Sequence, residues 1–96
     1  MSDKALYQQK KEAQLNEWKA DIDKLKARTS MASADAQIEM NQQIHALENK
    51  IDEGKVKLSD LIKATDDMYE SMKAGVESAW DSLKTAFSES TAKIKN

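Results

Sequence analysis

The chain has 96 residues, one third of which are charged, and its formal net charge is −2. Aromatic residues are scarce, proline and cysteine are absent, and there are only two glycines. This composition excludes a disulfide framework and a thiolate metal site, and it argues against general nucleic-acid binding, which needs a basic face. A β-sheet also requires turn residues between strands of period two, and neither feature is visible.

The remaining composition is rich in Ala, Lys, Glu, Gln and Leu, all of which are good helix formers. We therefore predict an all-α fold in a single domain over residues 1–96, built from long amphipathic helices in a coiled coil or helical bundle, without β-structure. The favoured arrangement is a long helix over about residues 3–64, followed by a shorter helix over about 67–94. A three-helix arrangement with breaks near Ser30 and Asp66 is the alternative.

The chain begins with polar residues, so no signal peptide is visible, and no run of eighteen apolar residues is present to form a membrane-spanning helix. We expect a cytoplasmic protein, although the mature form of an exported protein has the same features. Acidic and basic residues are interleaved along the whole sequence. This interleaving is typical of the solvated flanks of a coiled coil.

The first apolar stripe starts well inside the chain. Leu15, Trp18, Ile22 and Leu25 recur at steps of three and four, which is the average spacing that keeps one side of a helix against a partner helix. Upstream of Leu15, polar residues such as Lys11 occupy the equivalent positions. We therefore expect the N-terminal end of this helix to fray.

A second stripe, which we call the Met40–Met72 stripe, repeats the same spacing through the middle of the chain, and Gly54 and Thr65 fill its two gaps. Its apolar residues line a narrow seam rather than a broad core, so another helix must cover them. We predict a homo-oligomer, with a dimer favoured, that pairs through this stripe. Its members are Met40, Ile44, Leu47, Ile51, Leu58, Leu61, Met68 and Met72.

Three places are candidates for a turn. The first is the segment 29–35, where Ser and Thr residues are good helix caps and the sequence allows at least a bend. The second is Gly54, but two acidic residues precede it, and acids oppose the dipole at a helix C-terminus. The third is Thr65 with Asp66, followed by Glu70 in an arrangement similar to a capping box. None carries the Pro or Gly-Asn signal of an obligatory turn.

Residues 67–95 are the most amphipathic part of the chain. Their large apolar residues fall within an arc of about 120° on a helical wheel, with Glu77 and Asp81 roughly opposite. This layout favours a bundle or oligomer face. It also fits a helix that lies on a membrane surface, which is the alternative interpretation. The arc includes Met68, Met72, Val76, Trp80, Leu83 and Phe87.

Two stretches, EWKADIDKLKA over residues 17–27 and MKAGVESAWDSL over residues 72–83, are similar to those of a group of small bacterial coiled-coil domain proteins. These proteins are sometimes loosely labelled apolipoprotein-like. The resemblance extends over most of the chain and is carried by helix-pattern residues and two tryptophans. It implies a bacterial origin and a helical, self-associating product. The group has no assigned activity to transfer.

Metal-binding patterns are weak. His45 is the only histidine, and no second ligand stands at the spacing that a zinc site requires. Met40, Met68 and Met72 carry soft sulfur atoms suited to Cu(I), but all three occupy stripe positions, where Met is an ordinary core residue. We expect these side chains to pack rather than to bind metal.

Catalytic patterns are absent as well. Adjacent acids such as Asp66 and Asp67 point about 100° apart on a helix and do not converge on one atom. A phosphate-binding glycine loop or a nucleophile–base set cannot be assembled from one histidine and two glycines. We expect a protein that is not an enzyme and that uses no cofactor.

The leading functional hypothesis is therefore a structural or interaction module that acts through coiled-coil self-association or by presenting helix faces to a partner. The alternative, from a different class, is peripheral binding to a lipid surface through residues 67–95. The residues expected at the interface are Leu15, Trp18, Ile22, Leu25, Met40, Ile44, Leu47, Ile51, Leu58, Leu61, Met68, Met72, Val76, Trp80, Leu83 and Phe87.

Overall fold

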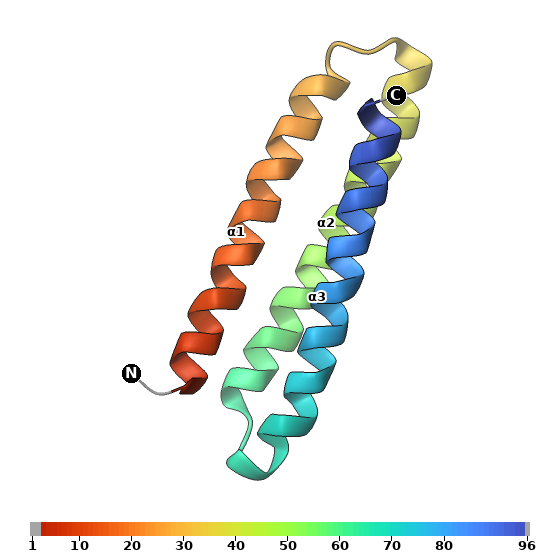
Figure 1. Cartoon of the computed structure of the whole chain (residues 1–96). Coiled ribbons are helices and arrows are strands. Elements are labelled where there is room, and N and C mark those ends of the chain that lie inside the picture. The colour runs from red at the N-terminus through yellow and green to blue at the C-terminus, as the bar shows by residue number, and fades with distance from the viewer. Residues whose placement is uncertain (1–2, 96) are drawn as a thin grey trace.

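The computed structural model describes the backbone of residues 3–95 and the side chains of residues 3–92. This part of the chain forms three antiparallel helices: α1 (Asp3–Thr29), α2 (Ala34–Lys63) and α3 (Asp66–Lys95) (Figure 1). The all-α helical bundle predicted from the sequence is confirmed, and no strand occurs among the described residues.

Helix α1 ends where its own side chains compete for backbone carbonyls. The Thr29 hydroxyl donates to the Leu25 carbonyl oxygen at 2.8 Å, and the Ser30 hydroxyl donates to the Ala27 carbonyl oxygen at 2.7 Å. Lys26 and Arg28 stand in the last turn, where cations interact favourably with the helix dipole. The helix therefore has a defined C-terminus at Thr29.

The continuous helix expected over residues 3–64 is wrong, because residues 30–33 form a turn. Ser33 is the N-cap of α2: its backbone is extended, with φ −64° and ψ 162°, and its side chain accepts from the Ala36 amide at 3.4 Å. Gln37 closes the turn by donating its side-chain amide to the Ala32 carbonyl oxygen at 2.9 Å. The three-helix alternative is the arrangement observed.

The second turn is shorter and lies within the segment expected to contain one. Ala64, the C-cap of α2, is extended, and its amide donates to the Leu61 carbonyl oxygen at 3.1 Å. The Thr65 carbonyl oxygen then accepts from the amides of Met68 and Tyr69, both at 3.0 Å, which starts α3. Two acidic residues occupy the first turn of α3, where they complement the positive end of the helix dipole.

The bundle is an elongated rod of 51 × 21 × 17 Å. Helix α2 packs closely against both neighbours, whereas α1 and α3 approach each other less closely. Because the number of helices is odd, Asp3 and Lys95 lie at opposite ends of the rod (Figure 1). None of the described helices contains a segment long and apolar enough to cross a membrane.

Candidate functional site

The residues expected at an interface lie mainly inside a single chain. All three helices contribute to one buried cluster, so the part of the Met40–Met72 stripe that lies on α2 is covered by α1 and α3 of the same chain. Twelve of the sixteen expected residues are the buried hydrophobic core: Leu15, Ile22, Leu25, Ile44, Leu47, Ile51, Leu58, Leu61, Val76, Trp80, Leu83 and Phe87.

The other four expected residues are less buried, and Met68 is the clearest departure. Trp18, Met40 and Met72 are half-buried, whereas Met68 remains 56% exposed within the single chain. The reason is the run of steps of four from Met68 to Trp80. Each such step turns the side chain by about 40° around the helix, so one partner cannot cover both ends of the run.

The three methionines considered as copper ligands do not converge. Met40 stands near the start of α2, close to the α1–α2 turn. Met68 and Met72 stand in the first two turns of α3, beside the α2–α3 turn at the other end of the rod. About 35 Å of α2 separates these two regions, at 1.5 Å per residue. The described residues also contain no group of three or more His, Asp or Glu able to hold a metal ion.

A polar cluster, which we call the α1–α3 clamp, holds the N-terminal half of α1 against α3. The Tyr7 hydroxyl donates to Glu77 Oε1 at 2.6 Å, and the Lys11 ammonium donates to Glu77 Oε2 at 3.2 Å. Lys11 is only 5% exposed, and its Nζ lies 5.3 Å from the centroid of the Tyr7 ring and 5.6 Å from that of Trp80. The fraying expected at this end is therefore opposed by a partly buried ion pair and by cation–π contacts.

The clamp shifts the proton affinities of its members. Burial and the hydrogen bond to Glu77 raise the pKa of the Tyr7 hydroxyl above its ordinary value. The hydrogen bond from Tyr7, helped by Lys11 and Lys73, lowers the pKa of the Glu77 carboxyl, although partial burial acts in the opposite direction. The carboxylate is thus held in its charged form between a donor and a cation. This is the electrostatics of a structural clamp, since no proton is poised to transfer near neutral pH.

Next to the clamp, large aromatic rings fill the wider space between α1 and α3. The Trp18 ring stacks on Phe87, with centroids 5.7 Å apart and planes inclined by 15°, and it lies 6.1 Å from the Trp80 ring. Trp80 is 3% exposed, but its Nε1 makes no hydrogen bond within the described part of the chain, nor does Gln14 Oε1. Both residues line a groove of about 340 Å³. A bridging water is the simplest partner for such a donor and acceptor.

Gly54 makes the aromatic packing possible. It lies in the middle of α2 rather than in a turn, and it is buried. A Cβ atom at this position would lie 3.2 Å from Trp80 Cζ3 and 3.3 Å from Leu83 Cδ1, tighter than ordinary contacts. The glycine therefore gives Trp80 the room to pack against the α2 backbone, which explains the gap it leaves in the apolar stripe.

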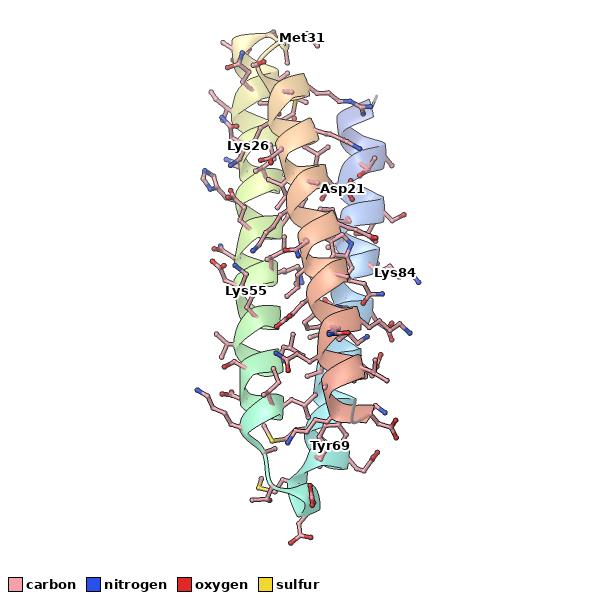
Figure 2. All side chains as sticks on the ribbon, turned by 90° about the vertical axis from the view of Figure 1, so that its left-hand side faces the viewer. Asp21, Lys26, Met31, Lys55, Tyr69 and Lys84 are labelled. Atoms are coloured by element: carbon pink, nitrogen blue, oxygen red, sulfur yellow. The ribbon has the colours of Figure 1, made fainter. Side chains whose placement is uncertain are left out.

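Met31 and Tyr69 lie at opposite ends of the rod and differ in exposure. Met31, which is 83% exposed, lies at the α1–α2 turn, whereas Tyr69 is half-buried near the α2–α3 turn (Figure 2). His45 also faces solvent, with Nδ1 3.7 Å from Glu48 Oε1. Neither region brings together groups that could perform acid–base or nucleophilic chemistry.

No known family of proteins, no curated protein and no solved structure matches this chain. The resemblance to small bacterial coiled-coil proteins therefore stays a prediction. The site has to be interpreted from its own geometry.

The sequence alone did not reveal Lys11 and Glu77 as partners. Lys11 was expected at a fraying end, and Glu77 on the side of the C-terminal helix opposite its apolar face. A helical wheel identifies only one buried side for each helix, whereas a helix in a three-helix bundle meets two neighbours. The available signal was a lysine at a stripe position, which needs an acid from another helix when it is buried.

Proposed function

We propose that this protein is a non-enzymatic spacer and interaction module, a three-helix rod that presents its outer helix faces. The observation that supports this most directly is that the apolar stripes of all three helices are used within one chain, while Asp3 and Lys95 lie at opposite ends of a 51 Å rod. A bundle built in this way holds whatever is joined to its two ends at a fixed separation.

The buried stripe also changes how self-association would occur. The homodimer expected from the sequence pairs through the Met40–Met72 stripe, and α1 and α3 already cover most of this stripe. Association between copies therefore uses the outer faces, or it requires one helix to exchange between chains. The first route leaves the rod intact, and we take it as part of the proposal.

The lipid-surface alternative is less favoured by this geometry. The apolar side of α3, including Val76, Trp80 and Leu83, is buried against the rest of the bundle. Insertion of this side into a membrane would require α3 to separate from α1 and α2, and would expose their stripes as well. Such opening costs the burial energy of several large side chains.

Small-angle X-ray scattering combined with sedimentation velocity tests the proposal. We expect a rigid particle with a length near 51 Å for a single chain, or for copies that associate side by side. Copies joined end to end would give a length near 100 Å and still satisfy the proposal. The scattering of a flexible or expanded chain would contradict it, because a spacer must keep a fixed length.

A further inference from the structure

Most of the turn between α1 and α2 keeps hydrogen bonds of the helical type. The Ser30 amide donates to the Lys26 carbonyl oxygen at 3.1 Å, four residues back, as in an α-helix. The amides of Met31 and Ala32 each donate three residues back, at 3.1 and 3.0 Å. At Ser33, φ is −64°, which is also a helical value, and only ψ, at 162°, is extended. Rotation about this one bond is therefore the clearest difference between the turn and a continuous helix.

The sequence of the turn does not oppose a helix either. Residues 30–33 include neither glycine nor proline, and no described residue has a positive φ. Helix-compatible residues continue at steps of three and four from α1 into α2, at Thr29, Ala32, Ala36 and Met40. A single helix over residues 3–63 is therefore accessible to this chain.

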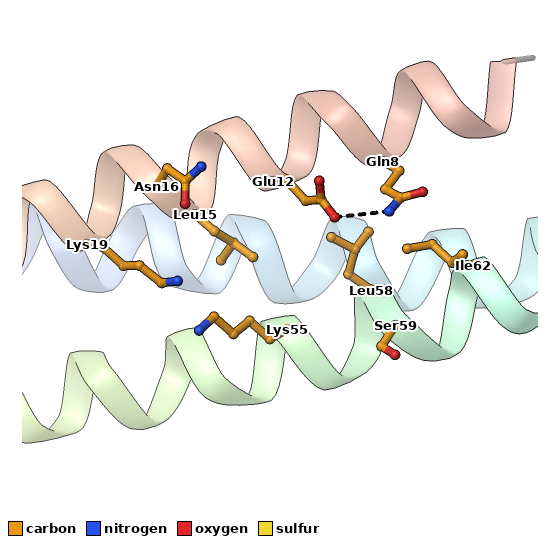
Figure 3. Close-up of a pocket in the computed structure, with 9 residues that line it drawn as sticks. All are labelled: Gln8, Glu12, Leu15, Asn16, Lys19, Lys55, Leu58, Ser59 and Ile62. Atoms are coloured by element: carbon orange, nitrogen blue, oxygen red, sulfur yellow. Dashed lines mark hydrogen bonds between the residues drawn. The ribbon is translucent and has the colours of Figure 1, made fainter. Parts of the chain in front are cut away.

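The surfaces that α1 covers can be covered by any copy of α1. Leu15 of α1 and Leu58 of α2 project into the space between the two helices, and they are 4% and 3% exposed (Figure 3). Helix α1 reaches α3 through the α1–α3 clamp and through Trp18, which stacks on Phe87. None of these contacts depends on the covalent link between α1 and α2. The α1 of a second copy makes the same contacts once the turn is straightened.

We propose that two copies of this chain form a dimer by exchanging α1. In the exchanged dimer each chain has one continuous helix over residues 3–63, and its α1 half packs against α2 and α3 of the other copy. The two bundles stand end to end, joined by two continuous helices that are each about 90 Å long. The apolar stripes of α1 and α2 need not face the same side of this helix, because each half packs in a different bundle.

This exchange is distinct from association through the outer faces, and it does not rest on the spacer function. Folded single chains exchange α1 slowly, because α1 must first expose Leu15, Ile22 and Leu25 to water. The dimer forms instead while chains fold at high concentration, when α1 of one copy meets α2 and α3 of another. If no exchange occurs, the single rod and its length are unaffected. The two proposals can therefore fail separately.

The first experiment refolds the full chain from urea at high and at low protein concentration, followed by size-exclusion chromatography with light scattering. We expect concentrated refolding to give a dimer that persists after dilution, and dilute refolding to give single chains. Copies held together by their outer faces should separate on dilution, whereas the exchanged dimer comes apart only when α1 unfolds. The absence of a persistent dimer after concentrated refolding would overturn the proposal.

The variant Ala34→Pro blocks the continuous helix and leaves the turn intact. Ala34 is the exposed first residue of α2, a position that accepts proline, and Ser33 already has the extended backbone that favours a following proline. In a continuous helix the same proline removes a hydrogen bond and clashes with the preceding turn. We expect a folded single chain and at least about tenfold less persistent dimer. An undiminished yield of dimer would overturn the exchange.

The variant Ser33→Ala is the opposite arm, at the neighbouring exposed position. It removes the hydroxyl that accepts from the Ala36 amide in the turn, and alanine favours a helix at residue 33. We expect about fivefold more persistent dimer than from the unchanged chain. An unchanged or smaller yield would contradict the role of the turn in holding α1 against its own chain.

Exchange also predicts that two defective chains rescue each other. Lys11→Glu and Glu77→Lys each place two like charges in the α1–α3 clamp of a single chain. In an exchanged dimer of the two variants, one bundle has the original Lys11–Glu77 pair and the other has the reversed pair. Refolding them together should give at least about tenfold more dimer than refolding either alone. Equal yields would overturn the proposal, because the clamp would then form only within one chain.

Discussion

The two glycines occupy helix positions that differ in the space around the backbone. Gly54 is buried, and an added Cβ would crowd Trp80 and Leu83, whereas an added Cβ at Gly75 would meet no atom within 4 Å. Glycine inside a helix costs about 0.5–1 kcal/mol relative to alanine because its unfolded backbone is freer. Gly75 therefore carries this cost without a packing benefit. At Gly54 the same cost is offset, because the missing Cβ leaves room for Trp80 and Leu83.

We predict that Gly75→Ala stabilises the bundle by about 0.5–1 kcal/mol, measured by urea unfolding. Gly54→Ala gains the same backbone term but forces Trp80 and Leu83 to move, so it should be less stable than Gly75→Ala. An equal gain for both variants would show that the Trp80 ring does not pack against the α2 backbone.

Glu77 gives the second residue-scale prediction. Its carboxylate accepts from Tyr7 and Lys11, and it is about half exposed, so Glu77→Gln should cost about 1–2 kcal/mol at pH 7. Because the pKa of Glu77 is lower in the folded state than in the unfolded chain, its contribution is present above the ordinary glutamate pKa. The contribution is lost as the pH falls through the folded pKa.

Urea unfolding at pH 7 and pH 3 measures this pH dependence of the free energy of unfolding. The stability difference between Glu77→Gln and the unchanged chain should shrink at pH 3, where the unchanged chain has lost part of the clamp. Asp81→Asn is the matched control, since Asp81 is exposed one turn further along the same helix. A difference that is the same at both pH values would rule out the charged form of Glu77 as the source of the stabilisation.

At the scale of the helices, the sequence predicted the buried sides and the second turn well, but its favoured arrangement missed the break at residues 30–33. Repeated steps of three and four are enough to identify residues such as Ile22, Leu47 and Leu83 as buried. The first turn was one of the candidates, but the favoured helix continued through it, because this turn needs no special residue: no described residue has a positive φ, and Ser33 and Ala64 leave the helical region through extended backbone. A turn of this kind requires neither Gly nor Pro, so the sequence offered only serine and threonine caps.

The two tryptophans should differ in their contribution to helix packing. Trp80 is 3% exposed and contacts Trp18 and the Gly54 region, whereas Trp18 is half-buried between α1 and α3. Trp80→Ala should cost about 3–5 kcal/mol, and Trp18→Ala about 1–3 kcal/mol. Thermal and urea unfolding of the two variants measures which substitution costs more stability. A larger cost for Trp18→Ala would contradict this packing.

For the molecule as a whole, the sequence predicted that the apolar stripes would be paired, but not which helix pairs with which. An apolar stripe on α2 can be covered by another chain or by α1 and α3 of the same chain. Burial removes the same surface from water in both cases. Residues 1–28 carry a net positive charge and residues 29–54 a net negative charge, which favours packing of the two segments side by side, and the Lys26–Glu48 pair is a local example. Such exposed pairs are too weak to choose between the two cases.

The central claim is that α1 folds back on α2 within one chain. The most direct measurement is the distance between spin labels on Ala20→Cys and Val56→Cys, two exposed positions in a chain without other cysteines, after dilution into excess unlabelled protein. Neighbouring helix axes lie about 10 Å apart, so the bundle predicts one short, narrow distance that exceeds this separation only by the reach of the two label arms. A distance of about 54 Å, the length of 36 residues of uninterrupted helix, would contradict the account.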